Sequence, residues 1–257
     1  MLIVLSPAKT LDYTSPILEV EPTRPEFATD ARRLVARLRE LSPAEVASLM
    51  DLSDPLAALN VARYAAYRAA PKPQAQRPAV LAFDGDVYDG LGARALDAES
   101  LAFAQQRVRI LSGLYGVLRP LDAMQPHRLE MGTRLENERG RDLYAFWGDR
   151  PARALKRALR DAGGGTLVNL ASEEYFRSVD LAALRAPVVQ PVFQDRRAGA
   201  WKVISFNAKR ARGAMTRWAI DRRIDVPDDL KAFDADGWAF DPTASDARTW
   251  VFRRDAG

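Results

Sequence analysis

The sequence predicts an α+β protein in which short buried strands are separated by amphipathic helices. Three apolar runs, at residues 2–5, 79–83 and 166–171, have the length and composition of buried strands. Apolar residues recur at helical spacing elsewhere, most clearly in segment 30–41. The chain has 257 residues, 47% of them apolar and 28% charged, a composition typical of a globular protein with a sizeable core.

Capping residues and apolar periodicity place the helices. Ser42 followed by Pro43 marks the start of a short helix that runs to Met50. Further helices are predicted over residues 30–41, 55–69, 97–108, 151–162 and 207–223, with a short one near 228–233. Asn207 is the expected N-cap of the helix that begins there.

Turn residues separate these elements. Repeated prolines predict loops over 13–28 and 71–78. Three Asp and two Gly within 84–91 predict a turn whose carboxylates cap the next element, because the terminal Glu of an EF-hand is missing. Residues 188–194 and 201–206 predict a β-hairpin, and 249–253 a last strand.

The composition excludes several kinds of chemistry. The chain has no cysteine, which removes disulfides, thiolate nucleophiles and cysteine-ligated metals and fits a reducing cytoplasm. His127 is the single histidine, so one chain cannot build a multi-histidine metal site, and we expect neither a metal nor a cofactor. No apolar run approaches the ~18 residues of a membrane span, and the first residues lack a basic signal-peptide region. The net charge of +4 mildly favours polyanionic partners.

Lys9 is a candidate functional residue because of its position. It follows strand 2–5 and the Ser6-Pro7 turn, and loops beyond the carboxyl ends of strands bind ligands in open α/β sheets. There it can pair with a phosphate or, with a lowered pKa, act as a base or a Schiff-base amine. The alternative is an ordinary solvated lysine. No glycine-rich loop surrounds Lys9, which excludes a P-loop.

The stretch 110–132 begins as a buried apolar run and ends in clustered charge. Gly113 and Gly116 predict a bend or a close approach of the backbone. Arg119, Arg128 and Glu130 follow. Such an element can deliver side chains into a cleft, and the alternative is a core strand followed by a solvated turn.

The predicted helix 207–223 is dense in positive charge near its start. Lys209, Arg210 and Arg212 oppose the helix dipole there unless an anion binds. Gly213 costs ~1 kcal/mol relative to alanine in a helix interior and therefore indicates close backbone approach. Both features favour an anion-binding role over a merely solvated face. We expect Lys9, the central stretch and this helix to line one pocket.

These motifs occur in an order that resembles the YaaA peroxide-stress resistance family of bacterial cytoplasmic proteins. The resemblance extends over nearly the full chain. It rests mainly on SPAKTLD at 6–12, FDGDVY at 83–88, LSGLYGVLRPLD at 111–122, RLEMG at 128–132, NLAS at 169–172 and KRARG at 209–213.

The resemblance implies a cytosolic protein that protects against hydrogen peroxide by limiting free iron and that binds duplex DNA. It also implies a mixed α/β fold, which we expect to be one domain over 1–257 with a mixed sheet flanked by helices and a positively charged cleft. A helix-hairpin-helix-like element is expected within 107–124, with Gly113 and Gly116 at its hairpin. The residues then expected to contact phosphates are Lys209, Arg210, Arg212, Arg119 and Arg128.

An enzyme that acts on a nucleobase or a phosphate-bearing substrate is the alternative. Lys9 would be its base or Schiff-base amine, Glu130 or Asp86 a second acid-base group, and the cations a phosphate clamp. Direct iron sequestration ranks lowest, because only carboxylates are available and no Glu-x-x-His motif is present. The expected partner is duplex DNA or another polyanion rather than a membrane, and a monomer is favoured.

Overall fold

The computed structural model of the chain describes residues 1–255 and is built on an eight-stranded mixed sheet. Its strands are β1 (Leu2–Leu5), β5 (Val108–Ser112), β6 (Gly116–Leu118), β8 (Leu167–Leu170), β9 (Val188–Arg197), β10 (Ala200–Lys202), β11 (Ala239–Phe240) and β12 (Thr249–Arg254). Their order is β11-β12-β9-β8-β1-β5-β6, with β10 paired to β9. β5, β1, β8, β9 and β12 run parallel, whereas β6, β10 and β11 are antiparallel to their neighbours. The predicted fold class is confirmed.

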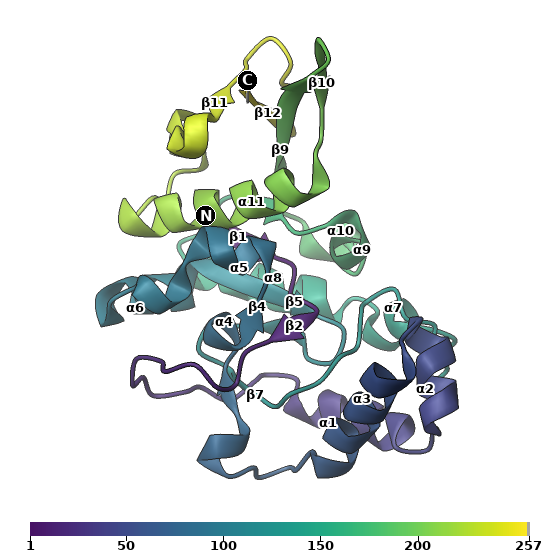
Figure 1. Cartoon of the computed structure of the whole chain (residues 1–257). Coiled ribbons are helices and arrows are strands. Elements are labelled where there is room, and N and C mark those ends of the chain that lie inside the picture. Colours follow the sequence, from purple (N-terminus) through teal and green to yellow (C-terminus); the bar gives the residue numbers. More distant parts are fainter. Residues whose placement is uncertain (256–257) are drawn as a thin grey trace.

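Helices flank this sheet (Figure 1). α11 (Ser205–Asp221) crosses the molecule beneath the C-terminal strands, while α1 (Ala28–Leu38), α2 (Pro43–Met50) and α3 (Asp54–Ala66) gather in the lower part of the view. The other helices are α4 (Ala79–Ala82), α5 (Asp86–Leu91), α6 (Ala98–Arg107), α7 (Leu143–Trp147), α8 (Arg150–Asp161), α9 (Glu173–Phe176) and α10 (Leu181–Leu184). Short 3₁₀ turns occupy Pro73–Ala75, Ala93–Ala95, Pro227–Ala232 and Ala235–Gly237. Two small ladders are formed by two-residue strands: β2 (Thr10–Leu11) pairs with β4 (Phe83–Asp84), and β3 (Arg77–Pro78) pairs with β7 (Ala123–Met124).

β1 lies in the middle of the sheet, and all four of its residues are buried. It pairs with β8 on one side and with β5 on the other, so that Val4 lies opposite both Asn169 and Arg109. A parallel strand that is covered on both faces has an unbroken apolar sequence. This explains why the strands predicted at 2–5 and 166–171 are both confirmed.

Local capping chemistry marks the starts of α2 and α6 correctly. Ser42 and Glu45 form a reciprocal capping box at the start of α2, and Asp97 accepts a hydrogen bond from Ser100 N at 2.8 Å at the start of α6. Asn207 is not the cap of α11, which begins two residues earlier at Ser205. The Asn207 side chain instead donates to Asp195 Oδ2 of β9 at 2.9 Å and ties the helix to the sheet.

Two predictions between residues 79 and 91 are wrong. Residues 79–82 form the buried turn of helix α4 instead of a strand, and residues 86–91 form α5 instead of a turn. A short apolar run fits a buried strand and a buried helical turn equally well, because too few residues are present to show a period. In the second segment, Gly85 has a φ of 148° and redirects the chain into α5.

The helix-hairpin-helix-like element expected within 107–124 is not there. This segment forms β5, β6 and β7, and Gly116 turns the β5–β6 hairpin with a φ of 66°. A helical hairpin does occur in α2 and α3, where Asp51 adopts the left-handed conformation with a φ of 50°. The buried apolar start of the central stretch therefore belongs to the sheet.

α5 and α11 cross at two glycines. A Cβ atom added to Gly213 would lie 2.7 Å from Leu91 N and closer still to Val87 O. A Cβ atom added to Gly90 would lie 2.9 Å from Ala214 N and closer still to Arg210 O. The close approach predicted for Gly213 is confirmed, and it brings the two helix backbones into contact.

Gly213→Ala should therefore destabilise the protein more than a surface substitution would. The added methyl group has no space, so α5 and α11 must separate, and we expect a loss of roughly 3 kcal/mol, as in strong overpacking. Urea unfolding measures this loss. Gly163→Ala is the control, because Gly163 has open space around it and a φ of 87°, and it should cost only roughly 1 kcal/mol of backbone strain. Equal losses for the two variants would contradict the tight crossing.

His127 is a core residue. Its side chain is 6% exposed, its ring packs edge-on against Tyr115 at 5.3 Å, and Nδ1 lies 2.8 Å from Gln125 O. Because a carbonyl oxygen only accepts, Nδ1 donates the hydrogen bond. Burial lowers the pKa of His127 to about 4, since the charged imidazolium loses its hydration.

This burial predicts a pH dependence of stability. Between about pH 6.5 and pH 4 the unfolded chain binds a proton at His127 and the folded chain does not, so the free energy of unfolding falls as the pH falls. The full loss is about 3 kcal/mol. Urea unfolding of the unmodified chain and of His127→Gln across this range measures it. Parallel curves for the two proteins would contradict the assignment.

Candidate functional site

The main candidate site lies at the carboxyl ends of β1 and β8, where the strand order of the sheet diverges to either side. β1 and β8 are neighbours, but the next strand of the sheet after β1 is β5 on one side, whereas β8 continues to β9 on the other. The crevice beyond the carboxyl ends of two such strands is the usual ligand site of an open α/β sheet. A cavity of about 420 Å³ occupies this position.

Segments that are distant in sequence supply the walls of this cavity, which we call the sheet-edge cavity. Residues 6–10 follow β1, residues 172–175 follow β8, residues 84–87 lead into α5, and α11 contributes Lys209 and Arg212. The two strand ends are joined by hydrogen bonds, because Ser172 N donates to Ser6 Oγ at 2.8 Å and the two hydroxyl oxygens lie 3.3 Å apart.

Lys9 and Glu130 meet in this cavity. Lys9 Nζ lies 3.4 Å from Glu130 Oε1, and Arg128 contacts the same oxygen at 2.9 Å. Gly113 makes the position of Glu130 possible, because a Cβ atom there would lie 3.0 Å from the Glu130 carbonyl carbon and closer still to Leu129 O. The Glu130 side chain is 22% exposed and that of Lys9 66% exposed, so the lysine faces an entering ligand.

α11 places two further cations in the sheet-edge cavity. Lys209 Nζ lies 3.7 Å from Asp86 Oδ2 of α5. Arg212 is half-buried, and within residues 1–255 its guanidinium has neither a salt bridge nor a side-chain hydrogen bond. Burial lowers the pKa of Arg212 by desolvating its charge. A partly desolvated guanidinium without a counter-ion is suited to bind an anionic ligand.

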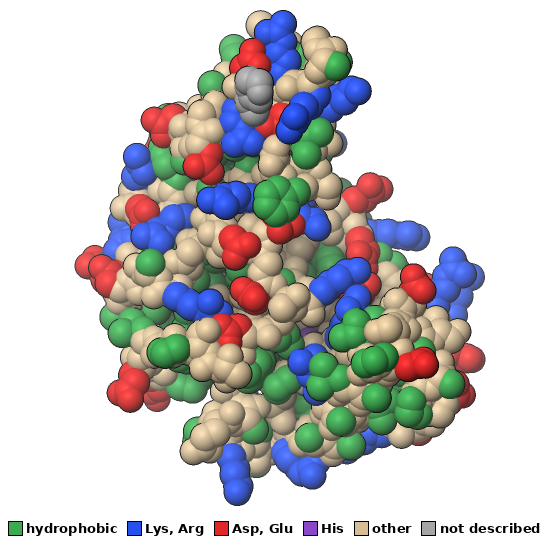
Figure 2. Space-filling model, in the orientation of Figure 1, with side chains coloured by type: hydrophobic (Ala, Val, Ile, Leu, Met, Phe, Trp, Pro, Cys, Tyr) green, Lys and Arg blue, Asp and Glu red, His purple; other side chains and the backbone are tan. Residues whose placement is uncertain are grey.

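The charge of the sheet-edge cavity is mixed. Its cations are Lys9, Lys209 and Arg212, and its carboxylates are Asp84, Asp86, Glu130 and Glu174. Basic and acidic side chains are also interspersed over the face shown in Figure 2. The cavity therefore differs from the positively charged cleft that the resemblance implies, and its paired groups suit proton transfer as well as anion binding.

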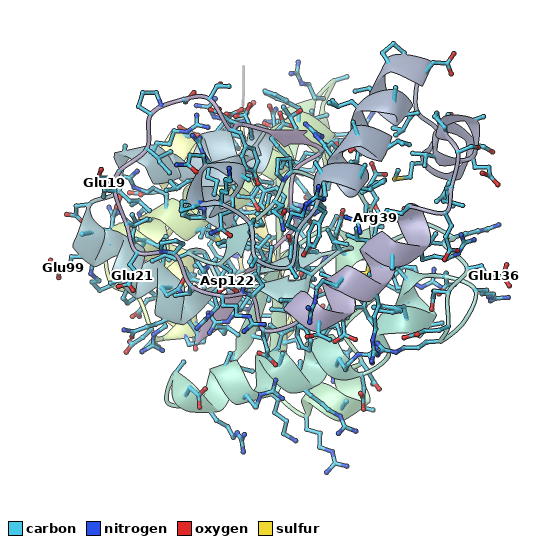
Figure 3. The ribbon with its side chains drawn as sticks, turned by 90° about the horizontal axis from the view of Figure 1, so that it is seen from below. Glu19, Glu21, Arg39, Glu99, Asp122 and Glu136 are labelled. Carbon is cyan, nitrogen blue, oxygen red and sulfur yellow. The ribbon has the colours of Figure 1, made fainter. Side chains whose placement is uncertain are left out.

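The remaining candidates lie elsewhere or serve the architecture. Arg210 points to another side of α11, where its Nε lies 3.9 Å from Asp236 Oδ2. Arg119 bonds to the buried Asp122 at 2.9 Å in a separate cavity, and Asp122 is labelled near the centre of Figure 3. Gly113 and Gly116 are buried, so they shape the scaffold rather than touch an anion.

Sequence reasoning missed several residues of the sheet-edge cavity. Ser172 precedes helix α9, but its side chain makes no cap hydrogen bond. Glu174 Oε1 accepts from Gly132 N at 2.8 Å, and burial raises the pKa of Tyr175, which also lines the cavity. The position of Ser6 and Ser172 directly after two apolar strands was the signal that could have identified them.

The described chain contains neither a cluster of metal-binding side chains nor a membrane-spanning helix. Among residues 1–255, no three or more His, Asp or Glu side chains are grouped so that they could hold a metal ion. No helix in the same part of the chain combines the length and apolar character needed to cross a membrane.

The fold is that of an α/β protein with a candidate ligand cavity at the switch point of a mixed sheet. The sequence model of the family described as "Peroxide stress protein YaaA" matches residues 1–244. A UPF0246 protein of Janthinobacterium sp. (strain Marseille) is 55% identical over 257 residues and one of Burkholderia pseudomallei (strain K96243) 56% identical over 259 residues, each alignment covering both chains fully. One of Azoarcus sp. (strain BH72) is 57% identical over 258 residues, 99% of each chain. The chain belongs to the peroxide stress protein YaaA family, and this description is consistent with a role in peroxide stress.

Proposed function

We propose that this protein is a cytoplasmic peroxide-stress protein that binds duplex DNA as a monomer and limits free iron. The observation that supports it most is the guanidinium of Arg212, which is unpaired among residues 1–255 and lies in one cavity with Lys9 and Lys209. An arginine guanidinium binds phosphate well, through two parallel hydrogen bonds. We propose the effect on iron as a consequence of nucleic-acid binding, and we assign no iron ligand in this chain.

The existing ion pairs determine how readily each cation of the cavity can bind a phosphate. Lys9, Lys209 and Arg128 must each leave or share a carboxylate before they bind a phosphate. Arg212 has no such partner among the described residues, so its contact with phosphate replaces only water. Contacts to the DNA backbone carry no base information, so the proposed binding is independent of sequence and weakens with salt.

Arg212→Gln should lower duplex affinity and make it less sensitive to salt. One lost phosphate contact reduces the slope of log affinity against log salt by about one. Fluorescence anisotropy with a short labelled duplex, at several salt concentrations, measures both quantities. Arg160→Gln is the control, because Arg160 is an exposed arginine on α8 away from the cavity. Affinity that ignores salt, or equal behaviour of the two variants, would reject the proposal.

An enzymatic role is the second candidate, and the Lys9–Glu130 pair favours it. A lysine beside a carboxylate, in a cavity at the switch point of the sheet, can add its amine to an aldehyde carbon of a nucleic-acid or nucleotide substrate. Loss of water then gives an imine, and Glu130 lies where it can transfer the protons of this step. Arg212 would hold a phosphate of the same substrate.

Borohydride trapping tests this second candidate. Reduction of the imine should leave a stable covalent adduct, detected by mass spectrometry, between the protein and an aldehyde-bearing DNA substrate. Lys9→Ala should abolish the adduct, whereas Lys209→Ala, which removes another lysine of the same cavity, should retain it. A panel of aldehyde-bearing nucleotides and DNAs that yields no adduct, or an adduct that survives in Lys9→Ala, would sink the Schiff-base mechanism.

A further inference from the structure

A second cavity, of about 380 Å³, lies between α1, the chain after α3 and the segment around β7. We call it the arginine cavity. Its charged wall consists of Arg24 from the loop before α1, Arg32 from α1 and Arg68 from the chain after α3. Tyr67, Tyr115 and Gln125 line it as well. It shares no residue with the sheet-edge cavity.

Of the residues that the structure describes, three cations and no carboxylate line the arginine cavity. Within residues 1–255, Arg24, Arg32 and Arg68 form no salt bridge, although other arginines of the chain form many. The cavity around Arg119 shows the usual arrangement, in which Glu26, Asp122 and Asp161 balance three arginines. Two acidic residues, Glu19 and Glu21, precede the arginine cavity in the loop that leads to it. Figure 3 shows both on the same side of the molecule as Glu99.

The floor of the arginine cavity is held by hydrogen bonds of the buried Gln125. Gln125 Oε1 accepts from Arg68 N at 2.9 Å, and Gln125 Nε2 donates to Arg68 O at 2.8 Å. Gln125 N donates in turn to the hydroxyl oxygen of Tyr115 at 3.2 Å. Both Gln125 and Tyr115 are buried, so the backbone that carries Arg68 is fixed before any ligand arrives.

The arginines retain donors for a ligand. Arg32 uses one nitrogen to donate to Thr29 Oγ1 at 3.0 Å, and Arg68 uses one nitrogen for the carbonyl oxygens of Ala65 and Tyr67. A guanidinium has five N–H donors, so most of them remain available. Three guanidiniums that repel one another around one concavity are stabilised when an anion of matching charge binds between them.

We propose that the arginine cavity binds a small phosphate-bearing polyanion. Its volume lies at the small end of the ~300–1,000 Å³ typical of ligand pockets, which suits a pyrophosphate or a nucleotide rather than a polymer. A DNA duplex carries its phosphates on a convex surface and cannot enter such a cavity. The proposal goes beyond the proposed function, because it assigns a different ligand to a different set of residues.

Isothermal titration of the full chain with inorganic pyrophosphate at low ionic strength tests this proposal. We expect saturable binding that Arg32→Gln and Arg68→Gln each weaken about tenfold, since each removes charged hydrogen bonds to the ligand. Arg160→Gln should bind like the unmodified chain. Arg212→Gln should retain this binding too, so the arginine cavity is tested apart from the sheet-edge cavity.

A second measurement guards against variants that change the fold. Arg32 and Arg68 are exposed, so their substitution should leave the melting temperature without ligand unchanged. Pyrophosphate should raise the melting temperature of the unmodified chain and of Arg212→Gln, but not that of the Arg32→Gln/Arg68→Gln double variant. Absence of saturable binding, or equal binding by the double variant, would overturn the proposal.

Discussion

The contact between α5 and α11 is the constraint on which the rest of this structure depends. Gly90 and Gly213 remove the side chains that would keep the two helices apart, so each backbone lies directly on the other. This crossing places Lys209 of α11 beside Asp86 of α5, and Arg212 in the same cavity, at the carboxyl edge of the parallel strands. The glycine that lowers the intrinsic stability of α11 is therefore the one that positions its cations.

Gly113 has the same role on the other wall of the cavity. It allows the backbone of residues 129–130 to lie against the end of β5, and this carries Glu130 to Lys9. The sheet-edge cavity then holds cations and carboxylates in near balance, with Arg212 unpaired among the described residues. The charge of the arginine cavity is unbalanced, because none of the described residues in its wall is acidic. Mixed charge suits chemistry on a bound anion, and unbalanced charge suits binding alone.

The strands and helices that were predictable from the sequence are those whose signals lie within a few consecutive residues. β1 and β8 were recognisable because buried parallel strands are continuously apolar, and α2 and α6 because their caps lie within the helix's first turn. α4 was missed because four apolar residues carry no period. Lys9 was identified from its position in the loop after a buried strand. The cations of α11 were identified because positive charge is unfavourable near the start of a helix. Ser6 and Ser172 could be placed after apolar strands, but their meeting depends on the strand order. The arginine cavity combines three segments that share no motif, so neither arrangement was predictable locally.

The most direct test of the account is a crystal structure of the protein bound to a short DNA duplex. The account predicts a backbone phosphate oxygen within hydrogen-bond distance of the Arg212 guanidinium, at roughly 2.7–3.2 Å, with the Lys209–Asp86 ion pair opened toward the same strand. A duplex that lies across another face, and leaves both Arg212 and Lys9 in contact with solvent alone, would contradict it.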